Sequence, residues 1–342
     1  MKRYIFIFYL LICNGLFSQE NELYDKALTC FKIGDYYCAK KKFNNLKISS
    51  NYIIQSNANF YLAVISAKLY ENNTNILFEN FLNEYSQSEK YDNALAYYSD
   101  YLIKKRNYKS VVTLLNQDDL DLFSFENKIQ SYFNRAYANF MLGNIDLAEK
   151  DFLIVLSDKN SSKFYDAAFY YACILLDKDD LKTSKKYFEI IQEADIYGNE
   201  LPYYLSYIMF KNKDYQSVIE YLSERIDYSN LYNYEQLLLL NAKSYFGLKD
   251  YSNSVYFFEK YKNFSQKINE IELYELGFSY YKLADYNSAI NNFNKIINMD
   301  NYVSQYAYYY LANSYLAVDK KIEAANAFKS SYDKFKIIEN DL

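Results

Sequence analysis

The 342-residue chain contains no histidine and no tryptophan, and it has only one proline and six glycines. Without histidine there is no imidazole base, no histidine-ligated metal and no Ser-His-Asp triad. Six isolated glycines do not make the glycine-rich loop that cradles phosphates in nucleotide-binding proteins. So little proline and glycine also leaves few signals for β-hairpins or long irregular loops, which favours helices joined by short turns.

Cysteine and charge exclude further classes of function. The four cysteines have no CxxC spacing, so the sequence has no zinc or redox motif. The 38 basic and 43 acidic residues, for a net charge of −5, are spread along the chain and leave no basic footprint for nucleic acid. We therefore predict a protein that is not an enzyme, and expect no cofactor, no metal site and no nucleic-acid partner.

Residues 1–19 have the pattern of a secretory signal peptide. Lys2 and Arg3 precede an apolar run from Tyr4 to Ile12, and polar residues follow. The run is too short to span a bilayer. We predict cleavage near Ser18 or Gln19 and export to the periplasm or cell envelope.

Two other interpretations of this segment stay open: a buried first helix, and a lipid anchor on Cys13. Bulky Ile12 disfavours the lipoprotein, because a small residue is expected before the acylated cysteine. No later stretch is long and apolar enough to cross a membrane, so we expect no transmembrane segment after signal cleavage.

A turn followed by an apolar helix recurs at a nearly constant interval. The clearest copy is Ala284-Asp285-Tyr286, followed by a small residue, Ala289, and an aromatic one, Phe293. From Val111 onward the small residue recurs after 37, 36, 34, 36, 35 and 35 residues, a period typical of repeat proteins. These second-helix small residues are Ala39, Val111, Ala148, Ser184, Val218, Ser254, Ala289 and Ala324.

Another small residue, which we call the notch residue, stands twelve positions before each of these. A residue that is larger in most copies follows three positions later on the same helical face, so the first helix offers a notch beside a knob. An Asp or Asn in most of the turns suits the N-cap of the second helix. The notch residues are Ala27, Ser99, Ala136, Ala172, Ser206, Ala242, Gly277 and Ala312.

Residues 56–86 are expected to hold one more unit, with Ala63 and Ala67 in its first helix and Leu77 and Phe81 in its second. Its turn is longer by a residue or two, and the small partner is missing from the second helix. Nine units result, with no linker between them. We predict that residues 20–342 form one all-α solenoid.

The spacing of small, large, small and aromatic residues resembles the tetratricopeptide repeat family over essentially all of the mature chain. Two features depart from the family pattern: the early tryptophan is absent, and the proline that closes each repeat is missing from the interrepeat turns. The resemblance implies a right-handed superhelix of about nine antiparallel helix hairpins, each packed mainly on its neighbours. It also implies a concave groove, lined by the first helices, that holds a partner protein or peptide.

In this architecture the side chains three positions before and one position after each notch residue point into the groove. Most are aromatic, which suits the capture of an extended peptide or a helix. With 44 Tyr and 25 Phe in the chain, a compositional bias combined with ordinary packing is the alternative interpretation. The predicted groove residues are Tyr24, Phe133, Tyr137, Phe169, Tyr203, Tyr207, Tyr274, Phe278 and Tyr309, together with Leu28, Ala96, Asp100, Cys173, Leu239, Lys243 and Asn313.

Export implies an oxidising compartment, in which cysteines of the mature chain can form disulfides. Cys30 lies on the first helix of its unit and Cys38 on the second, across the Gly34-Asp35 turn. A disulfide between them would close a short loop and contribute about 2–3 kcal/mol. The alternative is two small buried thiols.

These patterns predict a non-enzymatic interaction scaffold of the bacterial cell envelope, with a protein or peptide partner in an aromatic groove. One alternative is a glycan-binding envelope protein that stacks sugars on exposed aromatic rings. Another is a structural component that self-associates through its C-terminal end. There, the helix through Phe328 continues with the apolar residues Tyr332, Phe335 and Ile337-Ile338.

Overall fold

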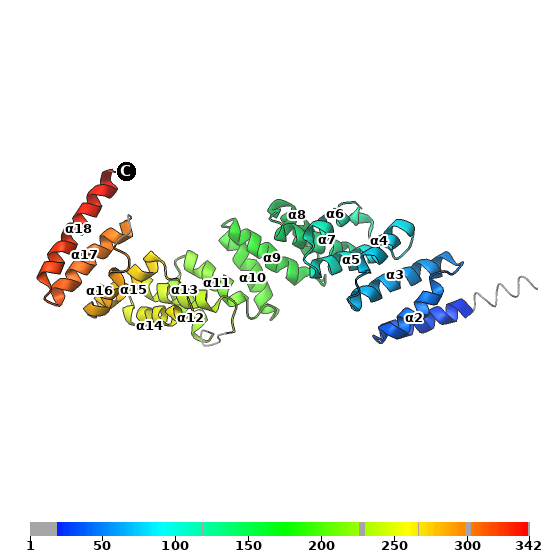
Figure 1. The fold of residues 1–342 in the computed structure, drawn as a ribbon, viewed down its shortest axis with the longest axis horizontal. Coiled ribbons are helices and arrows are strands. Elements are labelled where there is room, and N and C mark those ends of the chain that lie inside the picture. Colours follow the sequence, from blue (N-terminus) through cyan, green and yellow to red (C-terminus); the bar gives the residue numbers. More distant parts are fainter. Residues whose placement is uncertain (1–18, 118, 226–229, 266, 298–301, 341–342) are drawn as a thin grey trace, which may run out of the picture. The chain divides into compact units, whose positions relative to one another are not determined.

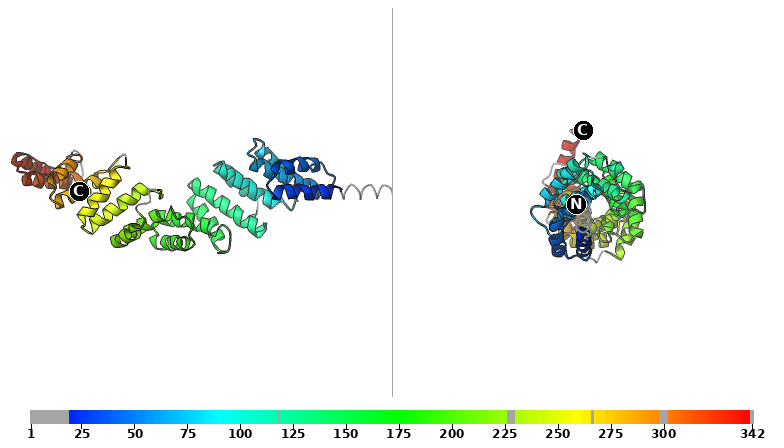
Figure 2. Two further views of the ribbon diagram at one scale, coloured as in Figure 1. Left: turned by 90° about the horizontal axis from the view of Figure 1, so that it is seen from below. Right: turned by 90° about the vertical axis from the view of Figure 1, so that its right-hand side faces the viewer.

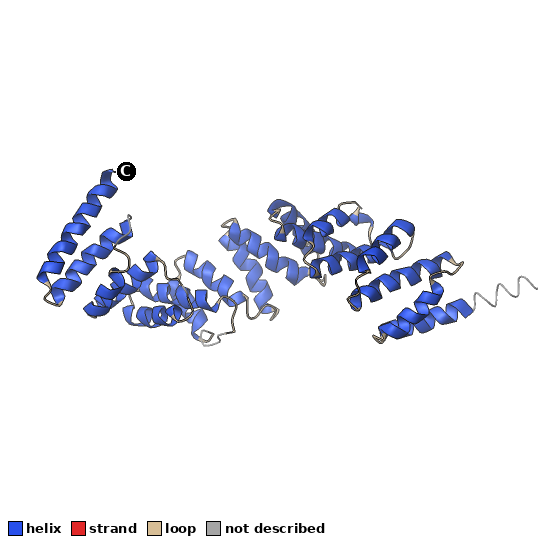
Figure 3. Cartoon of the chain, in the orientation of Figure 1, coloured by secondary structure: helices blue, strands red, loops and turns tan. Residues whose placement is uncertain are grey.

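The protein is described from a computed structural model that covers residues 19–117, 119–225, 230–265, 267–297 and 302–340. The predicted signal peptide, apart from Gln19, lies outside these residues. Helices are the only regular secondary structure in the described residues (Figure 3). The all-α prediction is confirmed.

The chain divides into two compact units, Met1–Asp180 and Leu181–Leu342, which we treat separately (Figure 1). Unit 1 contains a helix over residues 19–32, then α2 (Tyr36–Leu46), α3 (Tyr52–Lys68), α4 (Thr74–Glu84), α5 (Tyr91–Lys104), α6 (Tyr108–Leu115), the 3-10 helix η1 (Leu120–Leu122), α7 (Phe125–Met141), α8 (Ile145–Leu156) and α9 (Phe164–Asp177). Unit 2 contains α10 (Leu181–Glu193), α11 (Leu201–Lys211), α12 (Tyr215–Ser223), α13 (Tyr234–Gly247), α14 (Tyr251–Lys262), α15 (Glu270–Lys282), α16 (Tyr286–Phe293), α17 (Tyr302–Ala317) and α18 (Lys321–Asn340).

Within each unit the helices form antiparallel hairpins that stack on one another (Figures 1 and 2). The first helix of a hairpin contacts its own second helix and also the first helix of the next hairpin, as α5 does with α6 and α7 and as α13 does with α14 and α15. The stacked-hairpin architecture of the solenoid is therefore confirmed inside both units. Continuity of a single superhelix over residues 20–342 stays a prediction.

The predicted small residues lie at the centre of each hairpin. All eight notch residues and all eight second-helix small residues are buried. Gly277 shows how close the two helices come, because a Cβ atom added there would lie 2.9 Å from a ring carbon of Phe293. Small side chains let the helices approach, and the large residue of the second helix then fills the space beside them.

The hairpin turns share one cap. Each has a residue with positive φ after the first helix, and the next residue donates its N–H back into that helix, as Asp285 does to the Tyr280 carbonyl (3.0 Å). The Asp285 carboxylate then accepts a hydrogen bond from the Ser288 N–H (3.1 Å), which caps the second helix. The positive-φ residues are Gly34, Tyr70, Arg106, Gly143, Asp179, Lys213, Lys249, Ala284 and Asp319.

The second hairpin, α3 and α4, differs from the prediction that its second helix has no small residue. Its small partner is not missing: Thr74 is fully buried, with its Oγ1 atom 2.9 Å from the Oγ of Ser66. Because the turn is longer, α4 begins later in the sequence. The small residue, Thr74, is therefore the first residue of the helix instead of the fourth. Phe78 then takes the buried aromatic position, while Leu77 is only half-buried.

Candidate functional site

The candidate site is the surface formed by the first helices, at the positions three before and one after each notch residue. We call it the first-helix face and describe it for each unit. In unit 2 it is carried by α11, α13, α15 and α17, and in unit 1 by residues 19–32, α3, α5, α7 and α9.

In unit 2 the face is aromatic and partly open to solvent. Tyr274 and Phe278 are half-buried, and Tyr309 is 48% exposed. The ring of Tyr310 joins them, with centroid distances of 4.8 Å to Phe278, 6.3 Å to Tyr274 and 5.2 Å to Tyr309. The structure therefore brings three predicted groove residues into one aromatic cluster across α15 and α17.

A second aromatic group in unit 2 lies on α11. Tyr203 and Tyr207 are both half-buried, and their ring centroids are 6.1 Å apart. Tyr232 packs edge-on against Tyr203 at 5.9 Å, and the Nζ of Lys211 lies 5.9 Å from the centroid of Tyr207. Each ring keeps part of its surface available to a ligand.

In unit 1 the predicted aromatic positions are more deeply packed. Phe133 is 9% exposed and Phe169 is 7% exposed. Tyr137 is half-buried and packs against Tyr170 at 4.9 Å, while half-buried Tyr24 packs against Phe43 at 6.0 Å. Phe133 and Phe169 therefore contribute to the core of unit 1, with little surface left for a partner.

The remaining predicted positions are small, half-buried or paired. Ala96 is buried, and Leu28, Leu239, Cys173 and Asn313 are half-buried. Asp100 accepts a hydrogen bond from Lys104 Nζ (2.7 Å), and Lys243 Nζ lies 3.6 Å from Glu275 Oε2. Burial raises the pKa of the Glu275 carboxyl.

Burial raises the pKa of Tyr24 to about 12 and also raises the pKa values of Tyr137, Tyr203 and Tyr274. Neutral phenols donate and accept hydrogen bonds but do not act as nucleophiles at neutral pH. This suits a binding surface.

Two cavities open beside the first-helix face of unit 1. One, of about 520 Å3, lies between α5, α7 and the start of α9, and Tyr97, Asn127 and Gln130 are among the residues that line it. The other lies between α3 and α5 and contains Lys68, Tyr97 and Lys105. They share Tyr97, which reaches both.

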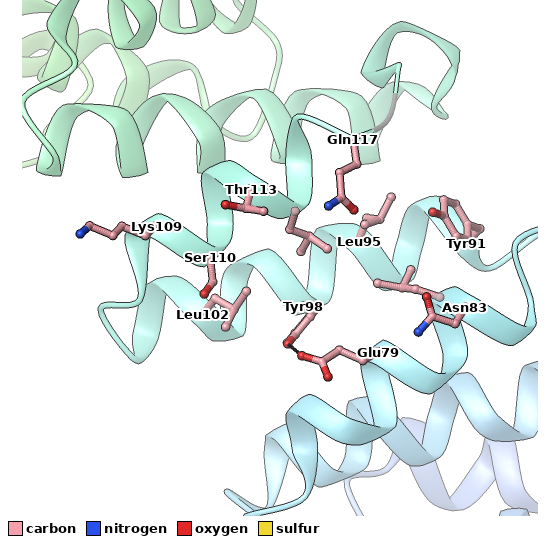
Figure 4. A pocket seen from close by; sticks show the side chains of 12 residues that line it. Glu79, Asn83, Tyr91, Leu95, Tyr98, Leu102, Lys109, Ser110, Thr113 and Gln117 are labelled. Carbon is pink, nitrogen blue, oxygen red and sulfur yellow. Dashed lines mark hydrogen bonds between the residues drawn. The ribbon is translucent and has the colours of Figure 1, made fainter.

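A further cavity of unit 1, of about 370 Å3, lies on the second-helix side, between α4 and α6 with α5 as its floor (Figure 4). Leu95 and Leu102 line the floor, and Gln117 lies at the side formed by α6. Tyr98 donates a hydrogen bond to Glu79 (3.0 Å) across it. No pattern in the sequence predicts this cavity.

The structure joins Cys30 and Cys38 by a disulfide across the first hairpin turn. Their Cα atoms are 5.8 Å apart, a separation that disulfides commonly span. Cys173 is half-buried and outside this bond.

Two features are absent from the described part of the chain. No group of three or more Asp, Glu, Cys or His side chains there could hold a metal ion. No helix there has the length and apolarity needed to cross a membrane.

One recurring contact between neighbouring hairpins was not predicted from the sequence. In several hairpins a tyrosine two residues before the notch residue, or before Ala63 in α3, stacks on the buried phenylalanine of the preceding hairpin. Tyr61 stacks in this way on Phe43 (4.9 Å) and Tyr204 on Phe188 (5.0 Å). Tyr170 on Phe152 and Tyr310 on Phe293 repeat it at 6.0 and 6.4 Å. The recurrence of tyrosine at that position was the available signal.

The C-terminal hairpin ends unit 2. Phe328 is half-buried against the cluster that contains Ala312 and Ala327, while Ile322 and Tyr332 are exposed. The side chains of Phe335 and Ile337-Ile338 lie outside the described ones. Self-association through this end stays a prediction.

Neither a protein-family model nor a curated protein matches the chain. Solved structures similar to it include the apo form of RapI, at 12% identity and a TM-score of 0.49, covering 94% of this chain and 99% of that one. PilF of Pseudomonas aeruginosa is similar at 14% identity and a TM-score of 0.43, with 75% and 96% covered. A STAND signal-transduction ATPase with a tetratricopeptide repeat sensor, from Pyrococcus horikoshii, is similar at 17% identity and a TM-score of 0.46, with 90% and 54% covered.

The chain itself carries the features that decide its fold: hairpins stacked inside each unit, small residues nested at a nearly constant interval, and one turn cap throughout. The fold is that of tetratricopeptide repeats. Identities of this size to the solved structures concern the fold alone and say nothing of what the chain binds.

Proposed function

We propose that this protein is an interaction scaffold that holds a partner protein or peptide on its first-helix face. The observation that carries the proposal is the contrast within three hairpins of unit 2, whose first helices are α11, α15 and α17. The notch residues are buried, whereas Tyr203, Tyr207, Tyr274, Phe278 and Tyr309 keep part of their rings exposed. Rigid aromatic rings with one accessible side provide a large contact area at a small cost in side-chain entropy.

A compositional bias alone would place tyrosines on both sides of the hairpins. Some are indeed exposed on second helices, as Tyr37 on α2 and Tyr256 on α14 are. What favours binding over compositional bias is that rings touch one another across α15 and α17. A continuous aromatic surface serves binding better than isolated rings.

Capture from cell-envelope extracts tests the proposal. A Tyr207→Ala/Tyr309→Ala variant should lose specific partners that the wild type retains. A Tyr37→Ala/Tyr256→Ala variant, which removes two exposed tyrosines from second helices, should retain them. Circular dichroism should show that both variants melt like the wild type. Identical partner sets for all three proteins would overturn the proposal.

We further propose that the chain is exported to the periplasm or cell envelope. The basic and apolar pattern of residues 1–19 supports this, as does a cysteine pair placed to form a disulfide. Cell fractionation followed by N-terminal sequencing should find a mature chain that begins near Gln19 outside the cytoplasm. An intact N-terminus in the cytoplasm would contradict export.

A further inference from the structure

A cavity of about 190 Å3 lies between α3 and α5 of unit 1, at the C-terminal ends of these two first helices. Three lysines and three tyrosines line it, and we call it the lysine–tyrosine cavity. They are Lys68, Lys104, Lys105, Tyr70, Tyr97 and Tyr101.

The cavity is positively charged in a chain whose net charge is −5. Asp100 is the carboxylate among its lining residues, and Lys104 Nζ pairs with it at 2.7 Å. Lys68 and Lys105 are exposed and form no ion pair among the described residues. Two ammonium groups are thus left without a counterion beside one opening.

Aromatic rings hold one of these charges in place. The Nζ of Lys105 lies 5.8 Å from the centroid of Tyr70 and 5.7 Å from that of Tyr101. Cation–π contacts of this kind are attractive and restrict the lysine side chain. The charge is therefore positioned before any ligand arrives.

Stabilisation of the helix ends does not account for the whole arrangement. One lysine in the last turn of α3 or α5 would interact favourably with the helix dipole. It would not require Tyr70, whose ring is 74% exposed. A tyrosine there gains little burial, but it completes the wall of the cavity.

We propose that the lysine–tyrosine cavity binds carboxylate side chains of an acidic segment in the partner protein. This inference rests on the proposed function, because the segment belongs to the partner held by the first helices. Lysine ammonium groups act as point charges that suit single carboxylate oxygens, and competition with inorganic phosphate separates the two anions. A nucleic acid or an anionic membrane would extend over the rest of an acidic chain and be repelled, but a short acidic segment would meet only the cavity.

The test uses a fluorescein-labelled peptide of alternating glutamate and glycine, with a glutamine–glycine peptide of the same length as the uncharged reference. Fluorescence anisotropy at low ionic strength should show binding of the glutamate peptide alone. Lys68→Gln/Lys105→Gln should weaken that binding roughly tenfold, since the two unpaired ammonium groups that would face the glutamates are removed. Added salt should reduce both the affinity and the difference.

The control variant is Lys41→Gln/Lys150→Gln, which makes the same charge change at exposed lysines of α2 and α8. It should bind the peptide within about twofold of the wild type, because neither lysine lines the cavity. Equal weakening by both variants would show that net charge alone is responsible and would overturn the cavity assignment. Absence of binding by the wild type would overturn it as well.

Competition distinguishes the chemical source of the anion. Free glutamate should displace the labelled peptide at lower concentration than inorganic phosphate does; the opposite order would make this a phosphate site and overturn the carboxylate assignment. If the peptide fails to bind but Tyr207→Ala/Tyr309→Ala still loses partners, this inference falls and the scaffold proposal stands. If the peptide binds and partner capture is unaffected by the tyrosine variant, the scaffold proposal falls instead.

Discussion

The two units use the same hairpin, yet their first-helix faces differ. In unit 1, Phe133 and Phe169 are buried, and cavities with charged and amide side chains open along α3, α5 and α7. In unit 2, aromatic rings reach the surface in two groups, one on α11 and one across α15 and α17. The packing rule fixes the notch and the buried phenylalanine in both units, while the outward positions remain free to acquire different chemistry.

The largest effect on stability is expected at the buried phenylalanines, which both units share. Phe152→Ala in unit 1 and Phe293→Ala in unit 2 each remove a fully buried ring that stacks on a tyrosine of the next hairpin. Each should lower the free energy of unfolding by about 3–5 kcal/mol, measured by urea denaturation. Tyr37→Ala, at a ring that is 77% exposed, is the matched control and should change it little. A loss below about 1 kcal/mol at either phenylalanine would contradict the shared construction.

Removal of the disulfide should destabilise unit 1 and leave unit 2 unaffected. Cys30→Ser/Cys38→Ser opens a crosslink with a sequence separation of 8 in unit 1. The loss should be about 2–3 kcal/mol, because the unfolded chain regains the entropy of a short loop. Hydrogen–deuterium exchange should speed up in peptides of the first hairpins and stay unchanged in unit 2, since each hairpin packs mainly on its neighbours. Equal acceleration in both units would show that the chain unfolds as one block.

A single methyl group should reveal the close approach of the hairpin helices in unit 2. Gly277→Ala would place its Cβ 2.9 Å from the fully buried ring of Phe293, which has no room to move aside. We expect a loss of about 1–3 kcal/mol in urea denaturation, although alanine is the better helix former. Gly198→Ala is the control, because an added Cβ there meets no atom within 4 Å. A stabilising Gly277→Ala would mean that the helices are not nested.

The smallest effect concerns the shared turn cap and should have opposite signs in the two units. Ala284 in unit 2 has a φ of 63°, so Ala284→Gly should stabilise the fold by about 0.5–1 kcal/mol. Gly143 in unit 1 has a φ of 78° with no neighbouring atom to obstruct a side chain. Gly143→Ala should therefore destabilise by about 1 kcal/mol through backbone strain alone. Thermal melts of both variants measure this, and a shift of the same sign would contradict it.

Sequence alone was sufficient for the hairpins, because burial of small residues at a nearly constant interval is a local requirement repeated many times. It predicted the notch residue Gly277, its second-helix partner Ala289 and the cap at Asp285. It failed at Thr74, because a longer turn shifted the start of α4 and the expected spacing no longer applied.

The candidate site was less predictable than the fold. Whether a residue such as Phe133 or Tyr309 is buried depends on the hairpin stacked next to it, and no pattern within one helix records that neighbour. The lysine–tyrosine cavity likewise joins Lys68 of α3 to Lys105, the C-cap of α5, which are far apart in the sequence. Only the packing of the two hairpins brings them together.

Site-specific photocrosslinking in intact cells tests the central claim most directly. A photoreactive phenylalanine analogue would replace Tyr309, on the first-helix face of α17, or Tyr256, an exposed residue on the second helix α14. We predict that the probe at position 309 forms a discrete crosslink to another protein and that the probe at position 256 does not. Crosslinks of equal yield from both positions, or from position 256 alone, would contradict a partner held by the first helices.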